Sequence, residues 1–344
     1  MQKLLTIVIP TYNMQAYLNR CLDSLIVRDD LISLIEVLII NDGSKDNSSS
    51  IAHKYEELYT QSFRVIDKEN GNYGSCVNRG LAEATGKYIK VLDADDWFDT
   101  DEFEKYLIAL EHLDADMVLT GYNIVNAQEK AICKTYRANL NSGKAYDFQQ
   151  LDYDRVGVWM MHAVTYRVEL LKAINYFQTE GISYTDTEWT YIPMHAVNTI
   201  VYVDYAVYQY LIGRDGQTMD TSVLVKSVWQ HEHLARRLIL HAESLSEDEK
   251  KGFGFLTLER QIKYVVDLVY IICLLKQDSS QFNNDKLVEF DLFLKEHKPD
   301  YYHLLAHKRI KPFFPVFYVR FWRNHKRRFP VDFLRNVYRK LNSR

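Results

Sequence analysis

Apolar runs typical of β-strands alternate with helical segments through the first 125 residues, and this alternation limits the possible folds more than any other feature. Strands are predicted at residues 4–10, 35–40, 63–66, 88–92 and 116–122. Apolar residues at helical spacing follow Met14, Ser48 and Val77. Strands that alternate with helices predict an α/β domain with a mostly parallel sheet and right-handed crossovers.

Three of the predicted strands end in polar loops, which identifies a candidate ligand-binding edge. Residues 11–13 (Thr-Tyr-Asn) follow the first strand, residues 41–46 (Asn-Asp-Gly-Ser-Lys-Asp) follow the second, and Asp93 follows the run at 88–92. The carboxyl ends of parallel strands lie along one edge of a sheet, where open α/β sheets bind their ligands. We therefore expect these polar residues to line one site.

Three carboxylates, Asp93, Asp95 and Asp96, follow the apolar run at 88–92. Asp93 and Asp95 are two residues apart, so in extended backbone both side chains point to the same side. Two like charges held this close raise each other's pKa unless a cation neutralises them. Carboxylate oxygens are ligands that suit Mg²⁺ or Mn²⁺. The alternative is an acidic turn, because aspartate is favoured in turns and at helix N-caps.

The cysteines and the N-terminus indicate where the protein works. The four cysteines at positions 21, 76, 133 and 273 have no paired spacing. This argues against a zinc site or a disulfide framework and fits a reducing compartment. Residues 1–10 read as a strand rather than a signal peptide, and the longest apolar stretch, 264–275, is too short to span a bilayer. A cytoplasmic location is expected.

The net charge of −4 hides a basic C-terminal tail. Residues 308–344 contain twelve lysines and arginines but one acid, so the tail carries +11 and the remainder −15. Residues 311–323 interleave these cations with aromatic side chains, including Phe313, Phe314 and Trp322. Such a segment suits the surface of an anionic membrane, with its rings at headgroup depth. Contact with nucleic acid and a homo-oligomer interface are the alternatives.

Four motifs carry a resemblance to a known family. They are Val-Ile-Pro-Thr-Tyr-Asn at 8–13, Val-Leu-Ile-Ile-Asn-Asp-Gly-Ser-Lys-Asp at 37–46, Asn-Arg-Gly at 78–80 with Ala-Thr-Gly-Lys-Tyr at 84–88, and Leu-Asp-Ala-Asp-Asp at 92–96. In this order and spacing they resemble the family 2 glycosyltransferases, inverting enzymes that use nucleotide sugars.

The resemblance implies an α/β domain of the GT-A fold over residues 1–218. Its nucleotide-binding half extends to about residue 125, and its acceptor half covers about 126–218. Residues 219–344 lie outside the resemblance. Their apolar residues recur at helical spacing and predict a helical C-terminal region, with the basic aromatic tail starting near residue 307.

The resemblance also implies a donor site and a metal site. Tyr12 would stack on the base, and Asp42 would accept a hydrogen bond from the uracil N–H, which favours a UDP sugar; a turn with a helix N-cap also accounts for Asp42. Asp95 would be the main ligand of Mn²⁺ or Mg²⁺, and Asp93 would contact the ribose or the metal. The other donor-binding residues that the resemblance implies are Thr11, Asn13, Asn78 and Arg214.

Alternatives remain open for Arg214 and for the position before Asn78. Arg214 would clamp the diphosphate, since a guanidinium matches phosphate geometry, although an exposed loop arginine is an equal alternative. Many family members carry an arginine directly before the asparagine that matches Asn78. This chain has Val77 there, which puts a nucleotide contact from that position in doubt.

An inverting transfer needs a base for the acceptor hydroxyl, and the resemblance implies Asp186. The segment Ile-Ser-Tyr-Thr-Asp-Thr-Glu-Trp at 182–189 matches the family's helix-opening acidic pair, with Thr185 where glutamate is common. Burial would raise the basicity of Asp186. Glu188 is the competing carboxylate, and an N-cap aspartate is the alternative for Asp186. His162 could reach the acceptor or the metal, or could be a satisfied core residue.

These features together predict metal-dependent, inverting transfer of a sugar from a nucleotide sugar to an acceptor hydroxyl. By family analogy, the acceptor is a glycan or lipid-linked saccharide in capsule or exopolysaccharide synthesis, at the inner face of the cytoplasmic membrane. The alternative is a non-catalytic nucleotide-sugar-binding or scaffold subunit of a glycan-assembly complex. Thr185 and Val77 are the residues that keep this alternative open.

Overall fold

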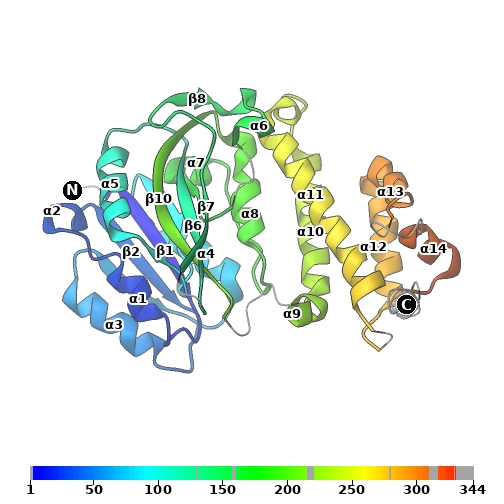
Figure 1. Cartoon of the computed structure of the whole chain (residues 1–344), viewed down its shortest axis with the longest axis horizontal. Coiled ribbons are helices and arrows are strands. Elements are labelled where there is room, and N and C mark those ends of the chain that lie inside the picture. Colours follow the sequence, from blue (N-terminus) through cyan, green and yellow to red (C-terminus); the bar gives the residue numbers. More distant parts are fainter. Residues whose placement is uncertain are drawn as a thin grey trace, which may run out of the picture. The chain divides into compact units, whose positions relative to one another are not determined.

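A mixed β-sheet forms the core of the N-terminal part of the chain (Figure 1). The computed structural model describes residues 3–128, 131–156, 160–214, 221–278, 280–309, 317–328 and 330. Its strands are β1 (Leu5–Thr11), β2 (Ile35–Asn41), β3 (Phe63–Asp67), β4 (Tyr88–Val91), β5 (Trp97–Phe98), β6 (Met117–Asn126), β7 (Ala131–Tyr136), β8 (Ala145–Asp147), β9 (Val164–Arg167) and β10 (Thr199–Ile212).

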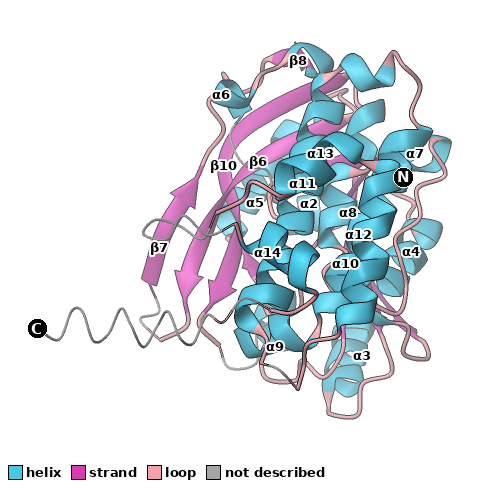
Figure 2. Ribbon diagram, turned by 90° about the vertical axis from the view of Figure 1, so that its right-hand side faces the viewer, coloured by secondary structure: helices cyan, strands magenta, loops and turns pink. Residues whose placement is uncertain are grey.

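The strand order is β3-β2-β1-β4-β9-β6-β10-β5, with β7 paired to β6 and β8 to β10. Strands β3, β2, β1 and β4 are mutually parallel, and β6 is parallel to β10. Strand β9 is antiparallel to both β4 and β6, between which it lies. Figure 2 shows β6, β7 and β10 as neighbouring long strands. The predicted α/β class and the predicted strands are confirmed.

The chain divides into two units. The first contains Met1–Asp215 and Ser246–Leu258, and the second contains Gly216–Leu245 and Glu259–Arg344. The boundary expected at residue 218 falls outside the described residues. The helices of the first unit are α1 (Leu18–Asp23), α2 (Asp29–Ile32), α3 (Ser48–Leu58), α4 (Asn72–Glu83), α5 (Thr100–Glu111), α6 (Tyr153–Val156), α7 (Val168–Ala173) and α8 (Asp186–Tyr191), with 3₁₀ turns at Phe148–Gln150, Pro193–Ala196 and Glu249–Lys251.

Helix α4 packs closely on the sheet, and glycine permits this contact. A Cβ added at Gly80 would lie 2.4 Å from a methyl carbon of Val8 in β1. Val77, on the same helix, is fully buried. The position at which many family members carry an arginine is therefore a core position here. Arg79, two residues along, is exposed and pairs with Glu83 at 2.7 Å.

Two regions differ from the simplest interpretation of the sequence. The helix expected from Met14 begins only at Leu18, because a hydrogen-bonded turn occupies the preceding residues and Asn13 has a left-handed φ of 54°. The stretch 126–150, which shows no periodicity, contains β7 and β8. Strand β7 is exposed along most of its length, so burial imposes no alternation of apolar and polar residues on it.

The second unit is helical, as predicted. It contains α9 (Thr221–Lys226), α10 (Val228–Ser244), the greater part of α11 (Phe253–Ile271), a π-helical turn (Ile272–Lys276), α12 (Asn284–His297), α13 (Pro299–Leu305) and α14 (Tyr318–His325). Among the described helices, none combines the length and the apolar character that crossing a membrane requires.

The structure changes the interpretation of the aromatic tail. Trp322 in α14 is fully buried, and its indole N–H donates a hydrogen bond to Asn284 at 3.0 Å. The neighbouring Arg323 pairs with the buried Asp291 at 2.7 Å. Trp322 is thus a core residue of the second unit and is not free to insert into a membrane. Phe313 and Phe314, together with residues 331–344, lie outside the described residues.

Candidate active site

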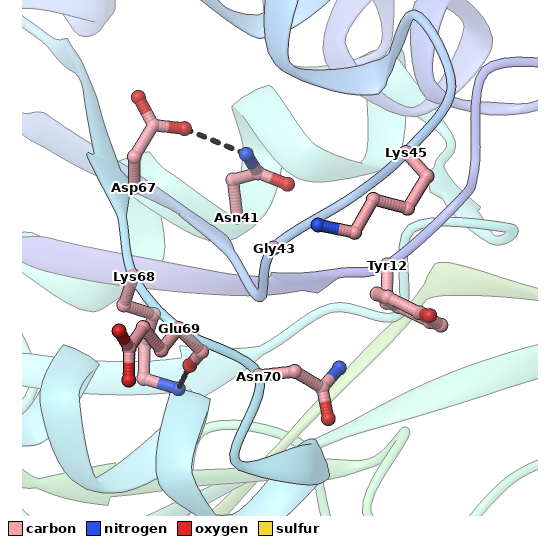
Figure 3. Close-up of a pocket in the computed structure, with 8 residues that line it drawn as sticks. All are labelled: Tyr12, Asn41, Gly43, Lys45, Asp67, Lys68, Glu69 and Asn70. Carbon is pink, nitrogen blue, oxygen red and sulfur yellow. Dashed lines mark hydrogen bonds between the residues drawn. The ribbon is translucent and has the colours of Figure 1, made fainter.

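The carboxyl ends of β1, β2 and β3 border a pocket of about 500 Å³. Because these strands are parallel, the residues that follow them meet at one edge, as the sequence predicts. Figure 3 shows Tyr12, Lys45 and Asn70 on one side and Asp67, Lys68 and Glu69 on the other. Tyr12 is 45% exposed, and its ring is available for stacking. The pocket lining is Tyr12, Asn41, Gly43, Lys45, Asp67, Lys68, Glu69 and Asn70.

Asp42 lies behind this pocket and points inward. Its side chain is almost fully buried, and it pairs with the ammonium group of Lys68 at 2.6 Å. It also accepts hydrogen bonds of 2.9 Å from the backbone N–H groups of Gly71 and Asn72. These N–H groups belong to the start of α4, where a helix has no backbone partners for its first donors. Asp42 therefore fixes the start of α4, and its assignment to uracil stays a prediction.

The loop after β1 is tied to the loop after β2. The side-chain oxygen of Asn13 accepts a hydrogen bond from the Lys45 N–H at 2.7 Å, and the Asn13 N–H donates to the Ser44 hydroxyl at 3.1 Å. Thr11 is 1% exposed, and its hydroxyl donates to the Ile9 carbonyl. Asn13 thus ties the two loops together and Thr11 is held within β1, while Tyr12 between them faces the pocket; the donor-binding roles of Thr11 and Asn13 stay predictions.

The acidic turn after β4 holds three carboxylates in different environments. Asp93 accepts a hydrogen bond from the Tyr73 hydroxyl at 2.8 Å. Burial, and then repulsion from Asp95, raise the pKa of Asp93 to about 7. Asp96 is fully buried and accepts from the Tyr208 hydroxyl and the Leu211 N–H, both at 2.7 Å. Burial raises the pKa of Asp96 as well.

Asp95 is paired with a cation. The Arg214 guanidinium donates to its carboxylate at 2.5 Å, and Arg214 also lies over the Tyr17 ring. Arg20 donates to the Asp95 carbonyl at 2.8 Å while stacking 3.8 Å from the Trp97 ring centre. Arg214 is therefore not a free loop arginine: it neutralises one of the predicted metal-binding carboxylates.

Asp186 is the first residue of α8 and lies near the acidic turn. Burial raises the pKa of Asp93 and of Tyr73, and the negative charge of Asp186 adds to both shifts, so the three side chains lie within electrostatic range of one another. Burial raises the pKa of Asp186 itself. Tyr184, two residues before Asp186, has a left-handed φ of 66°, a rare conformation for a bulky residue. Such strain is common at functional sites. The structure thus brings Asp186, Asp93 and Asp95 into one region.

A hydrogen-bonded connection links α4 to the segment before Asp186. The Asn78 amide accepts from the Gln178 N–H and donates to the Gln178 carbonyl, both at 2.8 Å. The buried Gln178 side chain then donates to the carbonyl and hydroxyl of Thr185 at 2.8 and 2.9 Å. Asn78 therefore positions this segment, and its donor-binding role stays a prediction. Thr185, where glutamate is common in the family, anchors the start of α8.

Glu188, the competing carboxylate, is fully buried. One of its oxygens accepts a hydrogen bond from the Thr179 N–H at 2.9 Å. This contact directs Glu188 toward the segment that Asn78 also holds. The geometry therefore favours Asp186 over Glu188 as the carboxylate that faces the acidic turn.

Gly74 allows α4 to approach the same segment, and its replacement by alanine is expected to be costly. An added Cβ would lie 2.0 Å from the Thr179 carbonyl oxygen, which is backbone and cannot turn away. We expect Gly74→Ala to lower the free energy of unfolding by about 1–3 kcal/mol, the usual range for overpacked cores. Urea unfolding measures this loss, and an unchanged midpoint would show that the contact is looser than described.

His162 lies on the inner side of the acidic turn. It is 3% exposed and stacks on Tyr210, with ring centres 4.3 Å apart. Burial and the charge of Lys90 lower its pKa to about 3. Lys90 in β4 is itself fully buried and donates to the His162 and Val164 carbonyls at 2.8 and 3.2 Å. Burial lowers the pKa of Lys90 to about 7.

Four site residues were missed by the sequence reasoning: Lys68, Tyr73, Lys90 and Gln178. Lys90 offered a visible signal, because a cation inside an otherwise apolar strand needs buried partners. Tyr73 and Lys68 lie in a turn-rich loop whose sequence gives no direction for their side chains. Gln178 joins Thr185 to Asn78, which lies 100 positions away along the chain, and the sequence does not reveal this pairing.

Comparison with known proteins gives consistent results. The family described as Glycosyl transferase family 2 matches residues 6–174. An uncharacterized glycosyltransferase of Mycoplasma pneumoniae, the MG025 homolog, is 36% identical over 136 residues, which is 39% of this chain and 44% of that protein. The chain thus spans less than half the length of this relative.

Solved structures of similar fold are more distant in sequence. Staphylococcus aureus TarS 1–349 has a TM-score of 0.60 at 16% identity, covering 86% of this chain and 82% of that chain. Its complex with UDP-GlcNAc has a TM-score of 0.52 at 18% identity, covering 86% and 92%. The mannosyltransferase PcManGT of Pyrobaculum calidifontis, in complex with GDP-Man and Mn²⁺, has a TM-score of 0.50 at 14% identity, covering 88% and 83%. These likenesses establish the GT-A fold expected from the sequence.

Proposed function

Because the chain belongs to glycosyl transferase family 2, we propose that it transfers one sugar from a nucleotide-sugar donor to an acceptor hydroxyl, inverting the anomeric carbon. The observation that carries this proposal is the placement of Asp186 within electrostatic range of Asp93, at the edge that also forms the pocket. A carboxylate there can serve the acceptor while the donor diphosphate occupies the region of the acidic turn.

The pocket beside Tyr12 is the proposed base and ribose site. An exposed tyrosine ring offers a stacking surface, and Lys45 and Asn70 add a cation and an amide at its border. We favour a UDP sugar, since TarS binds UDP-GlcNAc with this fold, although PcManGT binds GDP-Man. The Asp42 carboxylate already accepts three hydrogen bonds within the protein, so we assign most of the base contacts to the pocket lining and keep Asp42 as the predicted acceptor for the uracil N–H.

The acidic turn fits a divalent cation. A carboxylate with a raised pKa signals a charge that lacks full compensation, and the half-buried Asp93 is such a group beside Asp95 and Asp186. Asp93 and Asp95 are the residues that would hold the ion, with Arg214 beside them. When bound, a divalent cation supplies Lewis-acid stabilisation of the negative charge on the departing diphosphate.

In the proposed reaction Asp186 accepts the proton of the acceptor hydroxyl as that oxygen attacks the anomeric carbon. The bond between this carbon and the diphosphate oxygen breaks on the opposite face, which inverts the configuration. The diphosphate leaves with the electron pair, and the proton remains on the Asp186 carboxylate. The raised pKa of Asp186 strengthens it as a base.

A donor-binding experiment tests this function. We expect UDP sugars with Mn²⁺ to raise the thermal stability of the protein, because a ligand at a hundred times its Kd adds about 2.7 kcal/mol. Slow release of UDP in the same mixtures would identify an enzyme, whereas binding without any turnover would identify a nucleotide-sugar-binding scaffold. A panel of UDP and GDP sugars without any stabilisation would refute the proposal.

We also propose that the basic tail brings the enzyme to an anionic membrane, where a lipid-linked or glycan acceptor of capsule or exopolysaccharide synthesis would be found. Each lysine or arginine near such a surface contributes about 1 kcal/mol. We expect binding to anionic vesicles that weakens as salt rises. Removing residues 331–344 should weaken binding to anionic vesicles at a given salt concentration, while the buried Trp322 stays in place. Equal binding to neutral vesicles would exclude this electrostatic attraction.

A further inference from the structure

The imidazole ring of His162 lies beside the carboxylates at the end of β4. One ring nitrogen of His162 and carboxylate oxygens of Asp93 and Asp96 all lie within 4.8 Å of one another. We propose that His162 is a direct ligand, together with Asp93, of the divalent cation that serves the donor site. The proposal rests on the proposed function in so far as it assigns a cation to that site.

The His162 ring offers a donor atom that the described residues do not use. Its Nδ1 atom is buried and has no hydrogen-bond partner among them. A buried polar atom without a partner costs about 1–3 kcal/mol, so its persistence in a core calls for an explanation. The side chain is held rather than loose, since the rings of Tyr208 and Tyr210 pack 4.6 and 4.3 Å from its centre. A bound cation would use the lone pair that the imidazole carries.

The neighbouring groups support His162 and Asp93 in the way that outer groups support metal ligands. The Lys90 ammonium fixes the His162 backbone through its carbonyl at 2.8 Å. The Tyr73 hydroxyl orients the Asp93 carboxylate at 2.8 Å. The Tyr208 hydroxyl lies between the Asp93 N–H and the Asp96 carboxylate, and joins the two.

The other two carboxylates of the acidic turn are less available to bind a cation. Each oxygen of Asp96 already accepts a hydrogen bond, one from Tyr208 and one from the Leu211 N–H. Asp95 is paired with Arg214 and would have to give up this contact. Two ligands at about 2.1 Å from one ion lie at most about 4.2 Å apart, so Asp93 and His162 need only a small inward movement.

A mixed nitrogen and oxygen ligand set has a consequence for the identity of the ion. Mg²⁺ prefers an all-oxygen octahedral shell, whereas imidazole is a ligand of first-row transition metals. The inferred site should therefore distinguish a transition-metal ion, for which Mn²⁺ is the convenient probe, from Mg²⁺. This distinction does not follow from an Asp-x-Asp motif alone.

The test uses Mn²⁺ and electron paramagnetic resonance on the full chain, with and without UDP. We expect ¹⁴N modulation of the Mn²⁺ echo signal in the wild type, and its loss in His162→Phe. Phenylalanine keeps the ring between Tyr208 and Tyr210 and removes both nitrogens. We expect the same variant to weaken Mn²⁺ binding at least about tenfold and Mg²⁺ binding less.

His231→Phe is the matched control, because His231 is also a buried histidine with a lowered pKa but belongs to the helical unit. It should keep the ¹⁴N signal. Mn²⁺ bound without ¹⁴N modulation, or an unchanged signal in His162→Phe, would overturn the assignment, as would the absence of Mn²⁺ binding. A different result would show that the proposed function is wrong: no nucleotide sugar would then raise the thermal stability of the protein.

Discussion

Asp186→Asn is expected to reduce sugar transfer by about 10²- to 10⁴-fold, the usual contribution of a general base, while donor binding persists. Asparagine keeps the size of the side chain but cannot accept the acceptor's proton. Isothermal titration with UDP measures the retained affinity, and a coupled assay of transfer measures the loss. Glu188→Gln is the matched control: Glu188 is fully buried on the same helix and faces Thr179, so its effect should fall on stability.

The pH dependence of transfer gives a second signature of the same residue. Burial raises the Asp186 pKa, so the carboxylate becomes protonated at a higher pH than an exposed aspartate. A protonated base cannot act, and the rate should therefore fall on the acid side with a midpoint above the ordinary aspartate value. Asp186→Asn should lose the part of this acid limb that Asp186 causes, whereas any part caused by Asp93, whose pKa is also raised, should remain. Transfer within threefold of the wild type in Asp186→Asn would move the base to another residue.

Asp93→Asn is expected to weaken Mn²⁺-dependent donor binding at least about 100-fold, beyond the range for residues that only support a ligand. The change keeps an acceptor for the Tyr73 hydroxyl and removes the charge that would bind the ion. UDP titrations with and without Mn²⁺ measure the effect as the ratio of the two affinities.

Asp95→Asn is the informative comparison for Asp93→Asn. The sequence predicts Asp95 as the main ligand, whereas the geometry pairs Asp95 with Arg214 and leaves Asp93 beside His162. A larger loss in Asp93→Asn supports the geometry, and a larger loss in Asp95→Asn supports the family pattern. If UDP binding keeps its full Mn²⁺ dependence in both variants, the acidic turn does not bind the ion.

The strands that lead to the site could be predicted because each is a local apolar run followed by polar residues. The insertion of β9 between β4 and β6 could not, since that pairing joins strands about 40 to 80 residues apart and no local pattern records it. His162 precedes β9, and its approach to Asp93 depends on this insertion. The sequence could therefore name His162 as a candidate without placing it.

The direction of individual side chains was the second feature that could not be predicted from the sequence. An aspartate after a strand suits a ligand contact, a turn and a helix N-terminus equally well, and Asp42 turned inward to the start of α4. Asn78 likewise matched a family motif, yet its amide holds the Gln178 backbone. The role of Trp322 was equally open, because an aromatic residue among cations fits both a membrane surface and a small helical core. Residue type limits the possible roles, and packing decides among them.

The connection from Asn78 through Gln178 to Thr185 bears on how such a protein can diversify. Within the described residues, the side chains of Tyr12, Lys45 and Asn70 make no hydrogen bond to Asn78, Gln178 or Thr185, so selection could alter nucleotide preference there one residue at a time. A change at Asn78 or Gln178 would instead disturb the segment that carries Asp186, the proposed base. Nucleotide preference could therefore change through single substitutions. The residues that position Asp186 depend on one another, so we expect them to change together or not at all.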